Sequence, residues 1–201
     1  MTCIVGLVHD GDVFIGGDSA GANDAFDMMI RADEKVFKKD GMVFGFTSSF
    51  RMGQILRYSF IPPSQAVGQG DYEYLCGPWI DSLIDCLKEK GYASVANNNV
   101  TGGTFLVGFN GSLYHIDDDF QVGMRVDHYD SVGCGGRYAI GAMSVLIGDD
   151  ISPEEKINKA LAVAARFSAG VRGPFVVKKL STGQVDIVPA LVEILSKENN
   201  D

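Results

Sequence analysis

The sequence predicts an α+β protein in which antiparallel sheets are covered by helices. Pairs of short apolar and β-branched runs are joined by D-G, N-G or T-G turns, as in β-hairpins. Pairs of amphipathic helical segments separate these hairpins, whereas a doubly wound parallel sheet would alternate single strands with helices. The 201 residues are 46% hydrophobic and contain no long linker, so we expect one domain over residues 1–201.

Each hairpin is predicted from two runs and the turn between them. Four are expected, at residues 2–8 with 12–17, 35–38 with 42–46, 104–109 with 112–116, and 175–180 with 184–188. The first three turns contain Asp10-Gly11, Asp40-Gly41 and Asn110-Gly111, in which glycine readily takes the positive φ of a tight turn.

Helices are predicted where apolar residues recur every three to four positions. The expected segments are 48–60, 78–90, 137–147 and a fourth that begins at Ser152. Ser152-Pro153-Glu154-Glu155 combines an N-cap serine, a proline in the first turn and a glutamate three residues after the cap. The Pro62-Pro63 pair ends the first segment, and Gly91 follows the second.

Charge and composition exclude several kinds of partner. The chain has 17 basic and 26 acidic side chains and a net charge of -9, which disfavours nucleic acids and anionic membranes. It has no apolar run of about 18 residues and no secretory signal pattern, so we expect a soluble, cytoplasmic protein. Three histidines and four scattered cysteines offer no zinc-site spacing, and we expect no metal and no other cofactor.

Thr2 is the first candidate for chemistry. If Met1 is removed, the free α-amino group of Thr2 lies beside its own hydroxyl. An amine with a pKa of about 8 can accept the hydroxyl proton near neutral pH, so an N-terminal threonine needs no histidine as base. At position 2 of a strand, however, a threonine is usually only a β-former.

Four sequence segments, in order, resemble one family. They are T-C-I-V-G-L from Thr2, D-G-D-V-F-I-G-G-D-S from Asp10, D-E-K-V-F from Asp33 and V-G-C-G-G-R-Y-A-I-G-A from Val132. Together they look like the proteasome β-subunits and the bacterial HslV-type peptidases, which are N-terminal nucleophile hydrolases. This resemblance implies a four-layer αββα sandwich, peptide hydrolysis and homo-oligomeric rings that enclose a chamber. Its implied substrates are peptides or unfolded proteins, and an ATP-dependent unfoldase is a possible further partner.

The resemblance also implies roles for individual residues. Thr2 matches the family's nucleophile, Asp18 its acidic residue after the second strand, and Lys35 its lysine at the start of the third. A lysine near the α-amine disfavours a second positive charge and so keeps that amine basic, while a carboxylate holds the lysine. We therefore expect Thr2, Asp18 and Lys35 to be the catalytic residues.

The supporting residues depart from the family pattern. Thr47-Ser48 replaces the usual Ala-Gly, whose backbone N–H groups stabilise an oxyanion, and Cys134 replaces a serine. The family's Asp-x-x-Ser pair has no clean counterpart, and Ser168 is the nearest substitute. We expect Ser48, Cys134 and Ser168 to take oxyanion or supporting roles, Cys134 as a weaker donor than serine.

Other interpretations remain open. Gly17-Asp18-Ser19-Ala20-Gly21 matches the nucleophile elbow of serine hydrolases, although only His115 and His128 follow as bases and the hairpins do not suit a parallel sheet. Asp117-Asp118-Asp119 could attract a cation but is typical of a solvated turn. For the whole chain, the alternatives to a threonine peptidase are a non-catalytic shell or assembly subunit and a hydrolase of small amides.

Overall fold

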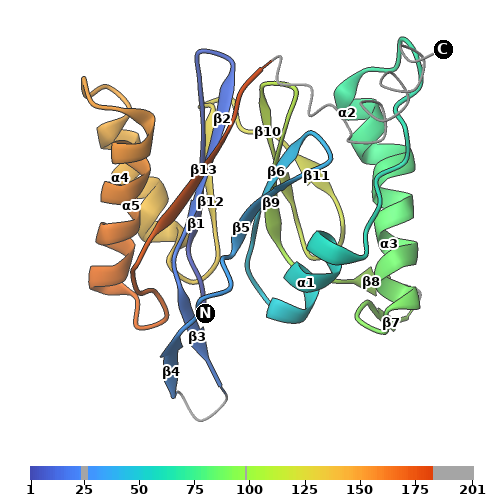
Figure 1. Cartoon of the computed structure of the whole chain (residues 1–201), viewed down its shortest axis with the longest axis horizontal. Coiled ribbons are helices and arrows are strands. Elements are labelled where there is room, and N and C mark those ends of the chain that lie inside the picture. The colour runs from blue at the N-terminus through green and yellow to red at the C-terminus, as the bar shows by residue number, and fades with distance from the viewer. Residues whose placement is uncertain (24–26, 98, 183–201) are drawn as a thin grey trace, which may run out of the picture.

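The computed structural model describes residues 1–23, 27–97 and 99–182. Two sheets lie face to face at the centre, and helices cover the outer face of each (Figure 1). The predicted α+β class and the four-layer αββα sandwich are therefore confirmed. None of the described helices combines the length and the apolar character that a membrane crossing requires.

Both sheets are antiparallel throughout their described strands. The four-stranded sheet has the order β12 (Tyr129–Val132), β1 (Ile4–His9), β2 (Asp12–Gly17) and β13 (Val176–Leu180). The five-stranded sheet has the order β11 (Val122–Gly123), β10 (Ser112–Ile116), β9 (Phe105–Phe109), β6 (Met42–Phe46) and β5 (Val36–Lys39).

The residues at the turns set the register of three hairpins in these sheets, β1–β2, β5–β6 and β9–β10. Their central residues all have positive φ: Asp10 and Gly11, Asp40 and Gly41, and Asn110 and Gly111. This matches the twist that two-residue hairpin turns need, and all three predicted hairpins are confirmed. The predicted strand at 184–188 lies outside the described residues, and its expected partner β13 pairs with β2.

Several strands were not predicted. Two small hairpins pair β3 (Ala20–Ala22) with β4 (Met28–Ile30), and β7 (Ser94–Ala96) with β8 (Asn99–Thr101). Figure 1 shows the first of them projecting away from the sandwich. Strands of three residues carry too short a pattern for the alternation of apolar and polar residues to be recognised.

Helices form the two outer layers. The five-stranded sheet is covered by α1 (Phe50–Tyr58), α2 (Asp71–Tyr74), the π-helical segment η1 (Leu75–Trp79) and α3 (Ile80–Glu89). The four-stranded sheet is covered by α4 (Gly136–Leu146) and α5 (Pro153–Phe167) (Figure 1). Ser152 caps α5 as predicted, with its hydroxyl accepting from the Glu155 N–H at 3.2 Å.

The second helix begins earlier than predicted. We expected its start at Pro78, but helical structure begins at Asp71 and passes through η1 before α3. Gly77, with φ -112° and ψ -106°, is not helical and forms a kink directly before Pro78. The wider π-helical turn of η1 accommodates Pro78 inside the helix. From the sequence alone, this proline was interpreted as the first residue of the helix.

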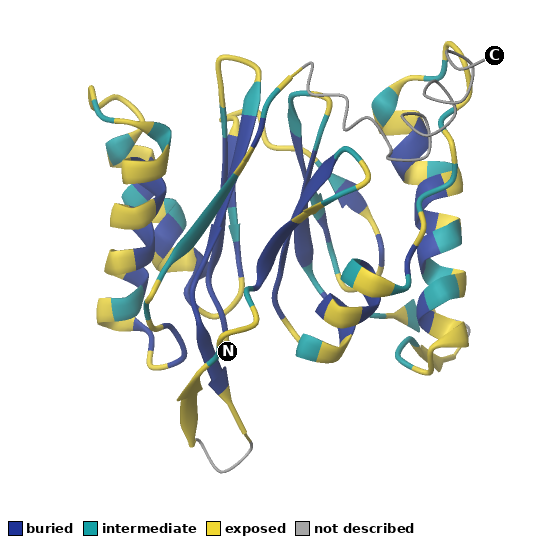
Figure 2. Ribbon diagram, viewed as in Figure 1, coloured by how far each residue is buried: buried dark blue, intermediate teal, exposed yellow. Residues whose placement is uncertain are grey.

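Alternation along β1 divides the core among the layers. Ile4 faces the five-stranded sheet and packs with Ile15 of its own sheet and Leu106 of the other. Val5 and Leu7 face α4 and α5. Figure 2 shows the two central sheets largely buried along their length. Because both faces of β1 and β2 are covered, the ends of these strands are held rigidly, and the candidate site lies at such an end.

Candidate active site

Strand order brings the ends of three chain segments together. β1 lies between β2 and β12, and Ile4 pairs with both Gly17 and Val132. Thr2 lies just before Ile4, so it lies beside the residues that follow β2 and those that follow β12. Only 4% of Thr2 is exposed.

Asp18, the first residue after β2, is held by four donors. Its Oδ1 accepts from the Cys3 N–H at 3.0 Å and from the Lys35 ammonium at 2.8 Å. Its Oδ2 accepts from the backbone N–H groups of Ala20 at 3.0 Å and Arg172 at 3.2 Å. Because the carboxylate is buried, these bonds fix its position and that of the lysine that it pairs.

Lys35 connects Asp18 to Thr2. Its ammonium donates to the carbonyl oxygen of Met1 at 3.4 Å, and the hydroxyl of Thr2 donates to the same oxygen. Burial is the strongest influence on Lys35 and lowers its pKa, while the charge of Asp18 opposes that change. The structure thus brings all three predicted catalytic residues together: Thr2 and Lys35 share the Met1 carbonyl oxygen, and Asp18 pairs with Lys35.

The turn after β12 closes over Thr2. Gly133 has φ +94°, and a Cβ built on it would lie 2.3 Å from the carbonyl oxygen of Thr2. Only glycine therefore allows this approach. The Thr2 N–H donates to the Cys134 sulfur at 3.3 Å, and the Ser168 hydroxyl donates to the same sulfur at 3.4 Å. The supporting residues Cys134 and Ser168 thus form a chain that ends at the nitrogen of Thr2.

The oxyanion turn differs from the expectation in one respect. We expected N–H groups near Thr47 and Ser48 to be available, but the Thr47 N–H donates to the Thr104 carbonyl at 3.1 Å. The Ser48 N–H makes no hydrogen bond to any described residue. Ser48 has φ +63°, a conformation that favours glycine, and its Oγ accepts from the Thr104 N–H at 3.1 Å. That hydrogen bond supports the strained backbone.

Two hollows flank Met1, Thr47 and Ser48. One, of about 60 Å³, is bounded by Thr2, Phe46 and Phe50. The other, of about 420 Å³, is open to solvent and is lined on its far side by polar residues from β10, β12 and their ends. Among its lining residues are Thr104, His115, Asp117, Ser131 and Cys134.

A buried carboxylate beside the larger hollow was not identified from the sequence. Asp130 on β12 binds His115 Nδ1 of β10 at 2.8 Å and Arg125 Nε at 2.7 Å. Burial opposes the charge on His115, but the hydrogen bond and charge of Asp130 raise its pKa. Burial also opposes the charge on Asp130, but His115 and the Ser131 N–H lower the pKa of that carboxyl.

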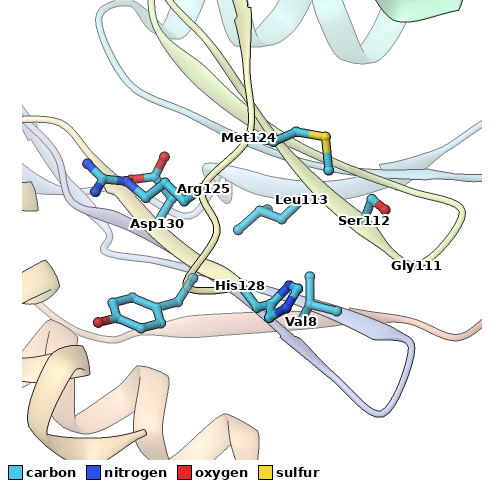
Figure 3. A pocket seen from close by; sticks show the side chains of 9 residues that line it. Val8, Gly111, Ser112, Leu113, Met124, Arg125, His128 and Asp130 are labelled. Carbon is cyan, nitrogen blue, oxygen red and sulfur yellow. The ribbon is translucent and has the colours of Figure 1, made fainter. Parts of the chain in front are cut away.

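This cluster joins the two sheets, since β10 belongs to one and β12 to the other. The sequence separates His115 from Asp130 by fifteen positions and carries no local signal of their contact. Figure 3 shows Arg125 lying beside Asp130 at the edge of a smaller hollow of about 140 Å³. Its walls include the apolar residues Val8, Leu113 and Met124. The residues that line it do not include Thr2, Asp18, Lys35, Cys134 or Ser168.

The alternative nucleophiles are poorly placed. The Ser19 hydroxyl is buried and donates to the Pro174 carbonyl at 2.7 Å, and Ser19 follows a strand of an antiparallel sheet. Burial raises the pKa of the Cys3 thiol to about 12, which leaves it protonated near neutral pH. The Thr2 hydroxyl, by contrast, shares its acceptor with the buried Lys35 ammonium, and Thr2 lines the hollow of about 60 Å³.

Comparisons with known proteins identify the fold. BPH from Thiobacillus denitrificans in complex with epoxomicin is 18% identical over 90% of this chain and 99% of its own, with a TM-score of 0.76. Eukaryotic HslV from Trypanosoma brucei is 19% identical over 90% of this chain and 99% of its own, with a TM-score of 0.65. The chain has the HslV fold.

BPH without the epoxomicin gives a similar result, with a TM-score of 0.74 at 17% identity over 91% of this chain and all of its own. No protein-family model and no curated protein sequence matches the chain. The sequence segments that resembled the HslV-type peptidases therefore predicted the correct fold, although identity to these structures is below one residue in five. In this chain the start of β1 brings Thr2 close to Asp18 and Lys35.

Proposed function

We propose that this protein is a threonine-type peptidase that hydrolyses peptide bonds with Thr2 after Met1 is removed. The observation that carries this proposal is the shared contact of the Thr2 hydroxyl and the Lys35 ammonium on the Met1 carbonyl oxygen. Removal of Met1 takes this oxygen away and turns the peptide nitrogen of Thr2 into an amine. The hydroxyl, the amine and the ammonium then lie together next to the larger hollow, which Met1 and Cys134 line.

The reaction follows from these positions. The Thr2 hydroxyl gives its proton to its own α-amine, and its oxygen attacks the peptide carbonyl carbon. The Lys35 ammonium opposes protonation of the free amine and so keeps it basic, while Asp18 holds the lysine. The Ser48 N–H donates to the developing oxyanion.

Collapse of the tetrahedral intermediate breaks the C–N bond, and the proton on the Thr2 amine passes to the leaving nitrogen. An ester between Thr2 and the acyl half of the substrate remains. Water, with the same amine as base, then hydrolyses this ester to release the acid. Cys134 and Ser168 orient the amine through the hydrogen-bond chain that ends at the Thr2 nitrogen.

Similarity to HslV and BPH supports a homo-oligomeric ring as the working form, with peptides or unfolded proteins as substrates and an ATP-dependent unfoldase as the partner. Native mass spectrometry of the full chain tests the ring, since the monomer has a mass of 21.6 kDa. A monomer at micromolar concentration contradicts this part of the proposal.

Three measurements test the chemistry. Intact mass of protein from its natural host should show loss of Met1, and an internally quenched peptide library should be cleaved. Thr2→Ala should abolish cleavage, whereas Thr2→Ser, which keeps a hydroxyl on the same atom, should retain part of it. Because BPH forms a complex with epoxomicin, this compound is the first probe for a Thr2-dependent adduct. Unchanged cleavage by Thr2→Ala contradicts the proposal.

A non-catalytic shell subunit is the second candidate. The observation that favours it is that Met1 engages both Thr2 and Lys35, which is a stable arrangement if Met1 is retained. The strained Ser48 and the weakly donating Cys134 point the same way. Quantitative retention of Met1 in the native protein would favour this candidate, and Thr2-dependent peptide turnover would exclude it.

A further inference from the structure

The larger hollow beside Thr2 has a chemical character of its own. Its far wall carries His115 and Asp117 from the end of β10, together with hydroxyls such as those of Thr104 and Ser131. The smaller hollow, on the other side of Thr47 and Ser48, is bounded instead by the rings of Phe46 and Phe50. The two hollows that flank Met1, Thr47 and Ser48 therefore differ in chemistry: the larger one is mainly polar on this wall, and the smaller one is bounded by aromatic rings.

The Thr2 nitrogen decides which part of a substrate lies in the larger hollow. Its N–H points to the Cys134 sulfur at 3.3 Å, and Cys134 lines this hollow. In the proposed reaction the amine returns its proton to the leaving nitrogen, and a general acid must lie within hydrogen-bond reach of the atom that it protonates. The leaving nitrogen therefore lies on the Cys134 side, and the residue that carries it faces the hollow.

Asp117 is the acidic residue that lines this hollow. Its Oδ2 accepts from the Gln121 side chain at 3.1 Å, while its Oδ1 lies 3.4 Å from His115 Nε2. His115 Nδ1 contacts Asp130 at 2.8 Å, and its Nε2 is buried, with no hydrogen-bond partner among the described residues. The Asp117 carboxylate is therefore the charged acceptor that a ligand in the hollow can reach.

When His115 is neutral, the charge on this wall is negative. Asp130 is paired with Arg125 at 2.7 Å, so these two charges offset one another. Asp117 keeps one oxygen without a cationic partner when His115 is neutral, and 44% of its side chain is exposed. A lysine or arginine side chain supplies both the positive charge and the N–H donors that this wall lacks.

We infer that the hollow between Cys134 and Asp117 is a specificity subsite for the leaving half of a peptide substrate, and that it selects a basic residue directly after the scissile bond. This rests on the proposed function, since it takes Thr2 as the nucleophile. Asp117 is the specificity-determining residue, and His115, held by Asp130, lies 3.4 Å from its carboxylate.

The test uses internally quenched peptides with one acyl half and either Lys, Leu or Glu after the scissile bond, with the cleaved bond verified by mass spectrometry. The Lys peptide should exceed the Glu peptide in kcat/KM by about tenfold at low ionic strength, since a rim charge acts with this strength when poorly screened. Asp117→Asn should lower this ratio to about twofold, and Asp117→Lys should invert it. The control Asp85→Asn makes the same charge change on an exposed face of α3 and should leave the ratio unchanged.

A fourth peptide carries the lysine on the acyl half and leucine after the bond, and its kcat/KM should not depend on Asp117. Hydrolysis of the common acyl-enzyme should also be equal for all leaving groups, because the leaving half has then departed. Equal kcat/KM for Lys and Glu peptides, or a ratio that Asp117→Asn does not change, overturns the subsite while Thr2-dependent cleavage leaves the proposed function intact. Absence of Thr2-dependent cleavage overturns both.

Discussion

Two buried carboxylates, Asp18 at the Thr2 site and Asp130 farther along β12, differ in how their cations meet solvent. Asp18 pairs with Lys35, and the side chains of this pair are 0% and 1% exposed. Asp130 is also buried, with 5% of its side chain exposed, but its partners His115 and Arg125 are 24% and 51% exposed. One cluster is sealed, and the other opens to a hollow.

This difference in solvent exposure suits the two clusters to different roles. A sealed pair with four donors on its carboxylate holds a lysine in one place, which suits the positioning of a nucleophile. An open cluster exchanges hydrogen bonds with water or with a ligand, which suits recognition. β12 connects the two, because Asp130 lies within it and Gly133, which packs on Thr2, follows its end.

The sharpest test of the sealed pair is Lys35→Met. This change leaves the Asp18 carboxylate buried without its cation, and we expect the free energy of unfolding to fall by about 3–5 kcal/mol. Urea denaturation measures it. Lys179→Met is the matched control, since Lys179 pairs with Asp12 at 2.6 Å on the surface and its loss should leave stability almost unchanged. Equal losses of stability in the two variants would show that the buried Asp18–Lys35 pair contributes no more to folding than the surface Asp12–Lys179 pair.

Gly133→Ala tests the connection between the clusters. A Cβ there meets the Thr2 carbonyl oxygen at 2.3 Å, and the backbone has positive φ. We expect a loss of about 2–3 kcal/mol in the free energy of unfolding and of most Thr2-dependent cleavage. Gly141→Ala, in α4 with nothing within 4 Å of the new Cβ, should instead stabilise the protein by about 1 kcal/mol. A neutral Gly133→Ala would mean that β12 does not constrain Thr2.

Asp130→Asn tests the open cluster. An asparagine still accepts hydrogen bonds but carries no charge, and Arg125 can turn its charge to water because it is half exposed. We therefore expect a loss of about 1–2 kcal/mol in the free energy of unfolding, less than for Lys35→Met. Chemical denaturation of both variants under one condition gives the order. A larger loss for Asp130→Asn would reverse the comparison.

Sequence alone predicted what local chemistry determines. The three hairpins could be predicted from the turn glycines Gly11, Gly41 and Gly111, because few other residue types accept the positive φ of these turns. Thr2, Asp18 and Lys35 could be named together because the resemblance to HslV-type peptidases supplied their relation. In the structure Lys35 pairs directly with Asp18 and shares the Met1 carbonyl oxygen with the Thr2 hydroxyl.

Contacts between distant segments could not be predicted. β12 was missed because Asp130 places a charge inside a buried strand, where His115 from the other sheet and the nearby Arg125 compensate for it. The start of the second helix was misplaced because Pro78 in a wide turn has the same sequence signature as proline at a helix start. In both cases tertiary packing decided against the local pattern.

The smallest expected effect is the pH dependence of the open cluster. Asp130 raises the pKa of His115 above 6.5 in the folded protein, so the protonated ring favours folding. Its contribution is fully present below about pH 6.5 and is lost as the pH rises through the folded pKa. The lowered pKa of Asp130 makes its own contribution present above about pH 3.8 and lost at lower pH.

Between about pH 4 and pH 6.5 both charges therefore stabilise the fold. We expect the free energy of unfolding to fall more in the native protein than in His115→Gln when the pH is raised from about 5.5 to about 8.5. His9→Gln, at an exposed histidine beside Asp10, should behave like the native protein. The same pH dependence in His115→Gln as in the native chain would show that His115 and Asp130 are not a pair of charges in the folded protein.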